Sequence, residues 1–287
     1  MSTELKPNIW LSLHDVTPNV LAHRQAVYCH NPAPFYKISL REAYLEPKFW
    51  LFNRLYYFLY RAFIRRNHCV VVQQGWMRDA FRRRMGPLPL VVAHPSLRAQ
   101  QPPEMATEKS SIVIFLYPSL PRVFKNFETV CDAARRLAER GCTGFEVRLT
   151  LSGAENRYAQ WLMARYGSMR CLRFIGRLEA RQMAVQYGEA TAVLFASKLE
   201  TWGLPISEAI AYGKPLIVAD LPYARETVGN YENVCFFPAT AAAPLADLMQ
   251  SIIERRWKPQ GASATDPAPP FAANWGELWR LLVEGVA

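Results

Sequence analysis

The stretch 193-VLFASKLETWGLPISEAIAYGKPLIVADLPYARETV-228 decides the fold of this chain. The short apolar runs 193–196 and 216–219 have the composition of buried strands. Proline is favoured at the first position of a helix and glycine just after its end, so Pro205 and Gly213 predict a helix over 206–212. A strand, a loop, a helix and a second strand in this order form the repeat of a parallel sheet with crossover helices.

Two carboxylates flank the loop of this repeat. Glu200 follows the carboxyl end of the first strand, and Glu208 is expected in the first turn of the helix. Ligands of open α/β sheets bind beyond the carboxyl ends of the strands, and a free helix start attracts phosphate. Carboxylates beside such an anion site can accept hydrogen bonds from hydroxyl groups. The loop is therefore suited to a sugar that is joined to a ribose through a diphosphate.

The stretch resembles the donor-binding motif of retaining glycosyltransferases of the GT-B fold, of the family 4 type. Their signature is a glutamate, seven residues, a second glutamate and an alanine, followed by Gly-x-Pro. It falls here on Glu200, Glu208, Ala209, Gly213 and Pro215. Two glutamates at this spacing mean little alone, and the ordered context of strands, aromatic-Gly-x-Pro and Gly-Lys-Pro makes the signal specific.

The resemblance implies an α/β protein with two Rossmann-like domains, of which the N-terminal one is abbreviated here. We expect an acceptor-side domain over 1–104, a donor-binding domain over 105–270, and a helix within 271–287 that could cross back to the first domain. The composition of 99–111 predicts a linker between the domains, and that of 259–273 predicts a second, extended linker. The glycine-rich loop that opens the first domain in the family is absent, which puts acceptor binding in doubt.

The resemblance also implies the residues of the donor site. They are Arg122, Lys125, Gly176, Arg177, Leu178, Glu200, Thr201, Trp202, Gly203, Leu204 and Glu208. In the family, the cations of the loop after the first strand of the second domain bind the donor phosphates, and the first glutamate contacts the sugar. The second glutamate receives the ribose hydroxyls, and the Gly-Arg pair meets the base. Exposed surface cations are the alternative for Arg122 and Lys125.

Catalysis is expected to depend on Glu200, Lys125 and His30. A histidine at a similar position after a strand lies near the donor sugar in the family, whereas a loop histidine that caps backbone groups is the alternative for His30. Cationic groups would stabilise the departing diphosphate electrostatically. No Asp-x-Asp occurs in the chain, so we expect no metal, and no cofactor beyond the nucleotide-sugar substrate.

Composition limits where the chain can act. It contains no run of 18 apolar residues, and its first residues lack the order of a signal peptide. Six scattered cysteines without Cys-x-x-Cys favour free thiols in a reducing compartment. We therefore expect a cytoplasmic protein, with peripheral association with the inner face of the membrane as an open alternative.

The basic charge of the chain is concentrated in its first part. Of the net charge of +10, residues 1–108 hold 14 Lys or Arg against 7 Asp or Glu, and the remainder holds 20 against 17. Within this part, 47-PKFWLFNRLYYFLYRAFIRR-66 has the length of one helix of about five turns. It is either a buried helix whose arginines reach solvent, or an interfacial helix on an anionic membrane surface. No nucleic-acid motif accompanies it, so nucleic acid is not expected as a partner.

The sequence thus favours a retaining, metal-independent glycosyltransferase. It would move a sugar from a nucleotide-diphosphate donor to a saccharide or lipid-linked acceptor in bacterial surface polysaccharide biosynthesis. The alternative is a nucleotide-sugar-binding, non-catalytic partner subunit of another glycosyltransferase, because the first domain is short. An epimerase or a phosphorylase of the same fold is less favoured, because further acid/base groups and a pyridoxal lysine motif are not recognisable.

Overall fold

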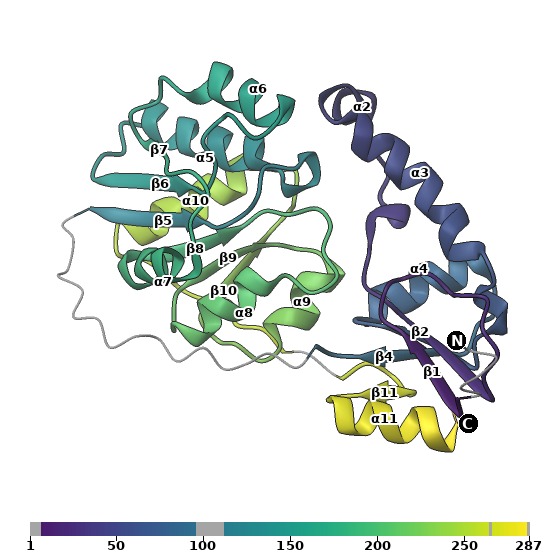
Figure 1. Cartoon of the computed structure of the whole chain (residues 1–287). Helices are drawn as coiled ribbons and strands as arrows, with labels where there is room; N and C mark the ends of the chain where they lie inside the picture. The colour runs from purple at the N-terminus through teal and green to yellow at the C-terminus, as the bar shows by residue number, and fades with distance from the viewer. Residues whose placement is uncertain (1–6, 96–111, 264–265, 286–287) are drawn as a thin grey trace.

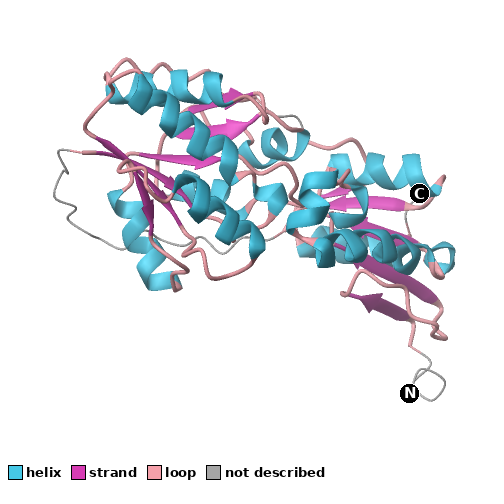
Figure 2. Cartoon of the chain, turned by 90° about the horizontal axis from the view of Figure 1, so that it is seen from above, coloured by secondary structure: helices cyan, strands magenta, loops and turns pink. Residues whose placement is uncertain are grey.

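The computed structural model of the chain describes residues 7–95, 112–263 and 266–285. These residues form two α/β domains that lie side by side, each built on a parallel sheet (Figure 1). The view from above shows the same two lobes with helices on both sides of each sheet (Figure 2). The predicted linker 99–111 lies outside the described residues.

The N-terminal domain has a sheet of five parallel strands in the order β1-β2-β3-β4-β11. Its strands are β1 Ile9–Ser12, β2 Arg24–Cys29, β3 Cys69–Val72, β4 Leu90–Ala93 and β11 Phe271–Ala272. Its helical segments are η1 Ala33–Phe35, α2 Leu40–Leu45, α3 Pro47–Arg61, η2 Ile64–Arg66 and α4 Gly75–Met85. Strands β3 and β4 are buried along their whole length, because helices cover both faces of the sheet.

The C-terminal domain has six parallel strands in the order β10-β9-β8-β5-β6-β7. The strands are β5 Val113–Tyr117, β6 Phe145–Leu149, β7 Leu172–Phe174, β8 Ala192–Phe195, β9 Leu216–Ala219 and β10 Val234–Phe237. The helices are η3 Val123–Lys125, α5 Phe127–Glu139, α6 Arg157–Tyr166, α7 Ala180–Glu189, α8 Leu204–Ala211, α9 Pro222–Val228 and α10 Ala242–Ile253. The strand order reverses between β5 and β8, so right-handed crossovers place α5 and α7 on opposite faces. Such a switch point is where open α/β sheets bind ligands.

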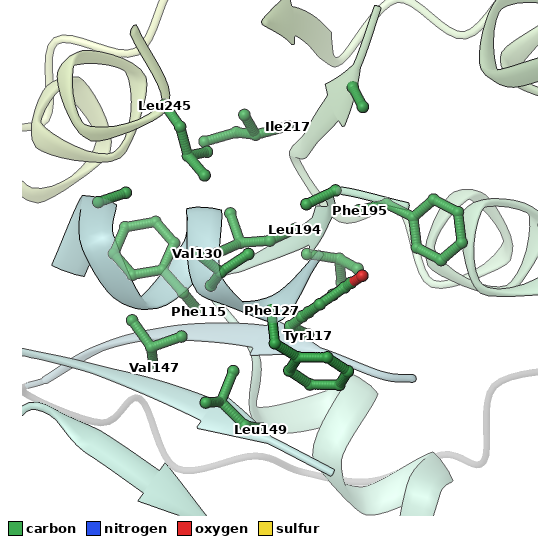
Figure 3. Close-up of a cluster of buried hydrophobic side chains, with 14 of the residues drawn as sticks. Phe115, Tyr117, Phe127, Val130, Val147, Leu149, Leu194, Phe195, Ile217 and Leu245 are labelled. Atoms are coloured by element: carbon green, nitrogen blue, oxygen red, sulfur yellow. The ribbon is translucent and has the colours of Figure 1, made fainter. Parts of the chain in front are cut away.

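One face of this sheet carries a closely packed apolar core. Figure 3 shows side chains of β5, β6, β8 and β9 meeting those of α5 and α10. Phe115, Phe127, Val147 and Leu245 have no exposed surface. This core orders the six strands and thereby fixes the positions of the loops at their carboxyl ends.

The end of the chain returns to the N-terminal domain. Strand β11 pairs with β4, with Phe271 opposite Val92, and α11 (Trp275–Glu284) buries Leu278 and Leu282 against the same sheet (Figure 1). The prediction that 259–273 is entirely an extended linker is wrong at its end. Two residues are too few to show a strand pattern in the sequence, and only the edge of β4 makes them a strand.

The aromatic segment 47–66 is not one continuous helix. Helix α3 ends at Arg61, and Phe63 has a left-handed backbone with φ of 56°. The break turns Ile64 into the core, where it is 4% exposed. No helix in the described part of the chain is both long enough and apolar enough to span a bilayer.

Candidate functional site

Lys125 and Glu200 form an ion pair at the carboxyl-terminal edge of the C-terminal sheet. Lys125 ends the short helix η3 after β5, and Glu200 lies in the loop after β8. The two side chains are 16% and 15% exposed, so the pair is largely shielded from water. The structure thus brings together a cation and a carboxylate that were both predicted to lie in one site. A phosphate arriving here would meet the ammonium group, and a sugar hydroxyl would meet the carboxylate.

Asn126 fixes the loop that carries Lys125, and the sequence reasoning did not single it out. Its backbone is left-handed with φ of 59°, a conformation that asparagine tolerates better than most residues. The buried side-chain amide donates to the carbonyl oxygens of Ala196 at 3.1 Å and Ala239 at 2.7 Å. These bonds tie the β5 loop to the ends of β8 and β10. The signal in the sequence was an asparagine directly before a helix.

Glu208 lies in the second turn of α8, not in the first. The helix begins at Leu204 because Gly203, with φ of 89°, serves as its N-cap. A Cβ atom at position 203 would lie 3.3 Å from Ile206 Cδ1, so glycine also gives the helix start its close packing. Glu208 accepts a hydrogen bond of 2.6 Å from the hydroxyl of Tyr187. Burial and the Glu208 carboxylate raise the pKa of Tyr187, so the phenol stays protonated and donates.

The remaining predicted donor residues lie at the same edge of the sheet. The indole of Trp202 donates to Ser207 Oγ at 3.0 Å, which ties the loop to α8. Thr201 is half-buried, and Leu204 is exposed. Gly176, with φ of 72°, lies in the loop between β7 and α7, and its N–H donates to the Leu151 carbonyl at 3.1 Å. In the same loop Arg177 is exposed and Leu178 is half-buried.

Arg122 pairs with a carboxylate of the other domain. Its Nε lies 2.7 Å from Glu46 Oε1, an ion pair without hydrogen-bond geometry, and Glu46 Oε2 accepts the N–H of Val123 at 2.8 Å. The guanidinium also lies 5.1 Å from the ring centre of Phe49. Arg122 is therefore engaged with the N-terminal domain, and its predicted contact with the donor phosphates stays a prediction.

A second ion pair joins the domains beside the first. Lys198 Nζ lies 2.6 Å from Glu42 Oε1, and Tyr36 donates to the same oxygen at 2.6 Å. Burial alone would raise the pKa of Glu42. The hydrogen bonds from Lys198 and Tyr36 outweigh burial, so the pKa of Glu42 lies below its ordinary value. Helix α2 and the start of α3 are thus held against the loops that bear Lys125 and Glu200.

His30 lies in the N-terminal domain, at the carboxyl end of β2, and its side chain is 46% exposed. The buried carboxylate of Asp15 holds its position by accepting the N–H groups of His30 at 2.6 Å and Asn31 at 3.1 Å. The hydroxyls of Tyr56 and Tyr60 also donate to Asp15, each at 3.0 Å. The sequence reasoning assigned no role to Asp15, which lies in a loop without a recognisable pattern.

A cavity of about 470 Å³ lies between the domains. Its lining residues are Asn31, Pro32, Ala33, Lys48, Phe49, Phe52, Arg122, Phe124 and Leu199. The wall is largely apolar, with one cation from each domain. Two of these residues, Phe124 and Leu199, directly precede Lys125 and Glu200 in the chain. The cavity therefore adjoins the ion pair of Lys125 and Glu200.

A third interdomain contact involves Glu226 of α9. Its carboxylate accepts the N–H of Gly75, at the start of α4, at 3.0 Å, and it lies 2.9 Å from His94 Nε2. The fully buried amide of Gln74 donates to Thr227 Oγ1 at 2.8 Å. His94 also packs edge-on against Trp202, with 4.8 Å between ring centres. The N-terminal domain therefore supports the loop that carries Glu200 and Trp202, and the sequence pattern around Glu226 did not reveal this contact.

No group of three or more His, Cys, Asp or Glu side chains is placed to hold a metal ion within the described ranges. All six cysteines are free thiols.

Solved structures with the same arrangement of two domains are glycosyltransferases. WaaG, a glycosyltransferase involved in lipopolysaccharide biosynthesis, matches with a TM-score of 0.64 and 13% identity over 85% of this chain and 68% of its own. HepE of Anabaena in complex with UDP-glucose matches with a TM-score of 0.62 and 17% identity over 81% and 63%. Sucrose-phosphate synthase of Thermosynechococcus elongatus gives 0.58 and 20% over 83% and 60%. These likenesses confirm the GT-B fold.

The chain spans less than two thirds of the length of HepE and of sucrose-phosphate synthase. No curated protein sequence matched it. A family model, described as glycosyl transferases group 1, matches residues 98–264, which is more than half of the chain and includes the whole loop with Glu200 and Glu208. The match, the fold and the motif agree, and the chain belongs to the glycosyl transferases group 1 family.

Proposed function

We propose that the chain is a retaining, metal-independent glycosyltransferase that moves a sugar from a nucleotide-diphosphate donor to a saccharide or lipid-linked acceptor. The observation that carries the proposal is the shielded pair of Lys125 and Glu200 beside the start of α8. The family motif assigns a phosphate ligand and a sugar ligand to these two groups, and both follow the carboxyl ends of strands, β5 and β8. Family membership supports the transferase class, and the donor roles of single residues belong to the proposal.

In the proposed reaction, the bond between the anomeric carbon and the diphosphate oxygen breaks while a bond to the acceptor oxygen forms on the same face of the sugar. The acceptor hydroxyl gives its proton to the departing diphosphate. Negative charge develops on the diphosphate, and Lys125 would stabilise it together with the N–H groups at the start of α8. Glu200 would exchange its contact with Lys125 for hydroxyls of the donor sugar, and would thereby orient the anomeric carbon.

Glu208 would bind the ribose. Its contact with the buried hydroxyl of Tyr187 holds the carboxylate in one orientation, and its remaining lone pairs can accept from ribose hydroxyls. Gly176, Arg177 and Leu178 would meet the base. His30, at the carboxyl end of β2 in the other domain, would contribute near the donor sugar, and Asp15 would position it by holding the turn at its backbone.

The setting that we propose is bacterial surface polysaccharide assembly on the cytoplasmic face of the membrane. WaaG and WaaB, a lipopolysaccharide outer core galactosyltransferase, are glycosyltransferases of lipopolysaccharide, and HepE was crystallised with UDP-glucose. These names support a nucleotide sugar and a cell-surface glycan as substrates for this chain. The mostly apolar cavity beside Lys125 favours an acceptor with an apolar part.

Two variants test the chemistry directly. Lys125→Ala and Glu200→Ala should each abolish transfer, because each removes one partner of the donor site, while circular dichroism and the melting temperature show a folded protein. Arg140→Ala is the matched control, since it removes an exposed ion pair with Asp247 at the other end of α5. Unchanged turnover in both Lys125→Ala and Glu200→Ala would refute the proposal. If transfer continues in the presence of EDTA, metal independence is supported. If EDTA abolishes transfer and added Mg²⁺ restores it, metal independence is refuted.

Donor binding separates this proposal from a non-catalytic role. A thermal-shift panel of UDP-, GDP- and dTDP-sugars should raise the melting temperature for one base, because a ligand of the native state stabilises it by mass action. The alternative role is that of a non-catalytic partner subunit of another glycosyltransferase. Purified chain that transfers sugar to an acceptor extract without a second protein excludes that role. Donor binding without any transfer favours it.

A further inference from the structure

Helix α3 exposes an apolar face along its whole length. Its large exposed apolar side chains, together with the residue just after it, are Trp50, Leu51, Phe52, Leu55, Phe58, Leu59 and Phe63. Each of them is between 39% and 65% exposed. Residues 51, 55, 58 and 59 follow helical spacing and form one continuous stripe. The helix runs along the outer edge of the N-terminal domain (Figure 1).

This face is additional to the one that the fold buries. The inner side of α3 places Phe49 and Tyr60 in the core, at 5% and 1% exposure. Helix α5 shows the usual arrangement, because its inner face is apolar and Glu139 and Arg136 are among its exposed residues. Single exposed apolar residues are ordinary on a protein surface, whereas a contiguous patch marks an interaction site.

The charge around the stripe is of one sign. Exposed cations on or beside α3 are Lys48, Arg54, Arg61, Arg65 and Arg66, and exposed Arg82, Arg83 and Arg84 end the neighbouring helix α4. No Asp or Glu occurs between Glu46 and Asp79 in the sequence. The carboxylate of Glu46 is paired with the guanidinium of Arg122. The partner of this face must therefore combine an apolar interior with negative charge at its surface.

The cations are arranged to receive anionic groups at the level of the aromatic rings. Arg54 lies 4.9 Å from the ring centre of Trp50, and Arg84 lies 5.6 Å from that of Tyr57. These four residues share a polar hollow of about 360 Å³ with Phe58. A hollow lined by two guanidinium groups suits a phosphate, because guanidinium binds phosphate oxygens in a bidentate manner.

We propose that the outer face of α3 lies in the headgroup region of an anionic phospholipid bilayer. An interfacial helix buries one apolar face at the acyl boundary while its cations meet lipid phosphates. A second copy of the chain is a poorer occupant, since two such faces would bring like charges together. The binding needs neither donor nor acceptor, so it stands independently of the proposed transfer. Because Lys48 and Phe52 also line the interdomain cavity, docking would bring that cavity close to the lipid.

Vesicle flotation of the full chain tests the proposal. The protein should float with vesicles that contain 30 mol% phosphatidylglycerol in phosphatidylcholine, and should stay at the bottom with phosphatidylcholine alone or in high salt. The variant Leu55→Glu/Phe58→Glu should lose about tenfold or more in partition, because two large side chains no longer enter the apolar layer. Trp279→Glu is the matched control, since Trp279 is 54% exposed on α11.

A charge-matched pair of variants tests the cations. Arg54→Gln/Arg61→Gln should lower the partition about fivefold for each cation that is removed. Arg136→Gln/Arg170→Gln removes the same charge from exposed positions of the C-terminal domain and should change the partition onto vesicles little. Equal flotation of wild type and α3 variants, or no flotation on anionic vesicles, overturns the proposal. A dimer in light scattering that Phe58→Glu dissociates, without any vesicle binding, would assign the face to a second copy instead.

Discussion

Substitutions of Asn126 test how the loop that carries Lys125 is held in place. Replacing it by glycine keeps the left-handed backbone possible but removes the amide that serves the carbonyl oxygens of Ala196 and Ala239. A buried carbonyl that loses its partner costs about 1–3 kcal/mol, so the loss of both hydrogen bonds in Asn126→Gly should lower the free energy of unfolding by about 2–6 kcal/mol. Donor affinity should fall as well, because Lys125 precedes the released residue.

Asn126→Ala should be worse still. Alanine at a φ of 59° carries a steric penalty of about 1–2 kcal/mol, which the smaller entropy of its unfolded chain offsets by about 0.4–1 kcal/mol. Alanine should therefore be less stable than glycine at this position by about 1 kcal/mol, from the difference of these two effects.

Asn67 is the matched control for the relative stabilities of the glycine and alanine variants. It is also a buried asparagine with two hydrogen bonds, to Thr17 Oγ1 at 2.7 Å and to the Ile64 carbonyl at 2.9 Å, but its φ is −74°. Here alanine should be more stable than glycine, because only the entropy of the unfolded chain distinguishes them. Urea unfolding at pH 7, followed by far-UV circular dichroism, measures all four variants. If alanine equals or exceeds glycine at position 126, the argument from the left-handed backbone is refuted.

Three further perturbations follow from the same geometry. Gly203→Ala should lower the melting temperature, because alanine is strained at the φ of 89° that starts α8; an unchanged melting temperature would contradict this. Tyr60→Phe should cost about 1–2 kcal/mol in urea unfolding, because buried Asp15 loses a donor; a neutral effect would show that Asp15 does not depend on it. Lys198→Met should cost about 2 kcal/mol at pH 7, because Glu42 loses its ion pair. The Glu42 pKa is lowered in the folded state, so its contribution exists above its ordinary value of 4.5 and is lost as pH falls. The penalty of Lys198→Met should therefore stay constant down to about pH 4.5 and shrink as the pH falls further, and a penalty that does not shrink in acid would argue against the pair.

Most strands and helices were predictable because their signals are local. The apolar run before Ser197 and the proline and glycine that bracket α8 predicted a parallel repeat, and the structure has it. The start of α8 was predicted two residues too late. The helix begins at Leu204 because Gly203 caps it with a left-handed backbone, and Pro205 alone does not indicate that cap. Strand β11 was missed because its two residues become a strand only at the edge of β4.

The candidate site was predictable to the extent that it lies in one motif. Glu200 and Lys125 were expected in one site because the resemblance assigns both to the donor. The structure pairs them, because the loops after β5 and β8 leave adjacent strands at one edge of the sheet. Asp15 and Glu226 were not assigned roles. Each accepts backbone N–H groups of residues that are distant in the chain, and no local pattern marks such an acceptor.

The sequence by itself determined the family, the donor-domain fold and the residue types at the edge of its sheet, because these depend on periodicity and on one ordered motif. Only the tertiary structure decided how Arg122 and Lys198 are used, because their partners come from the other domain: Glu42 from α2 and Glu46 from the junction of α2 and α3. It also decided which face of α3 is left uncovered. A helix with large apolar residues on several faces does not reveal which face is buried until a core is packed against it.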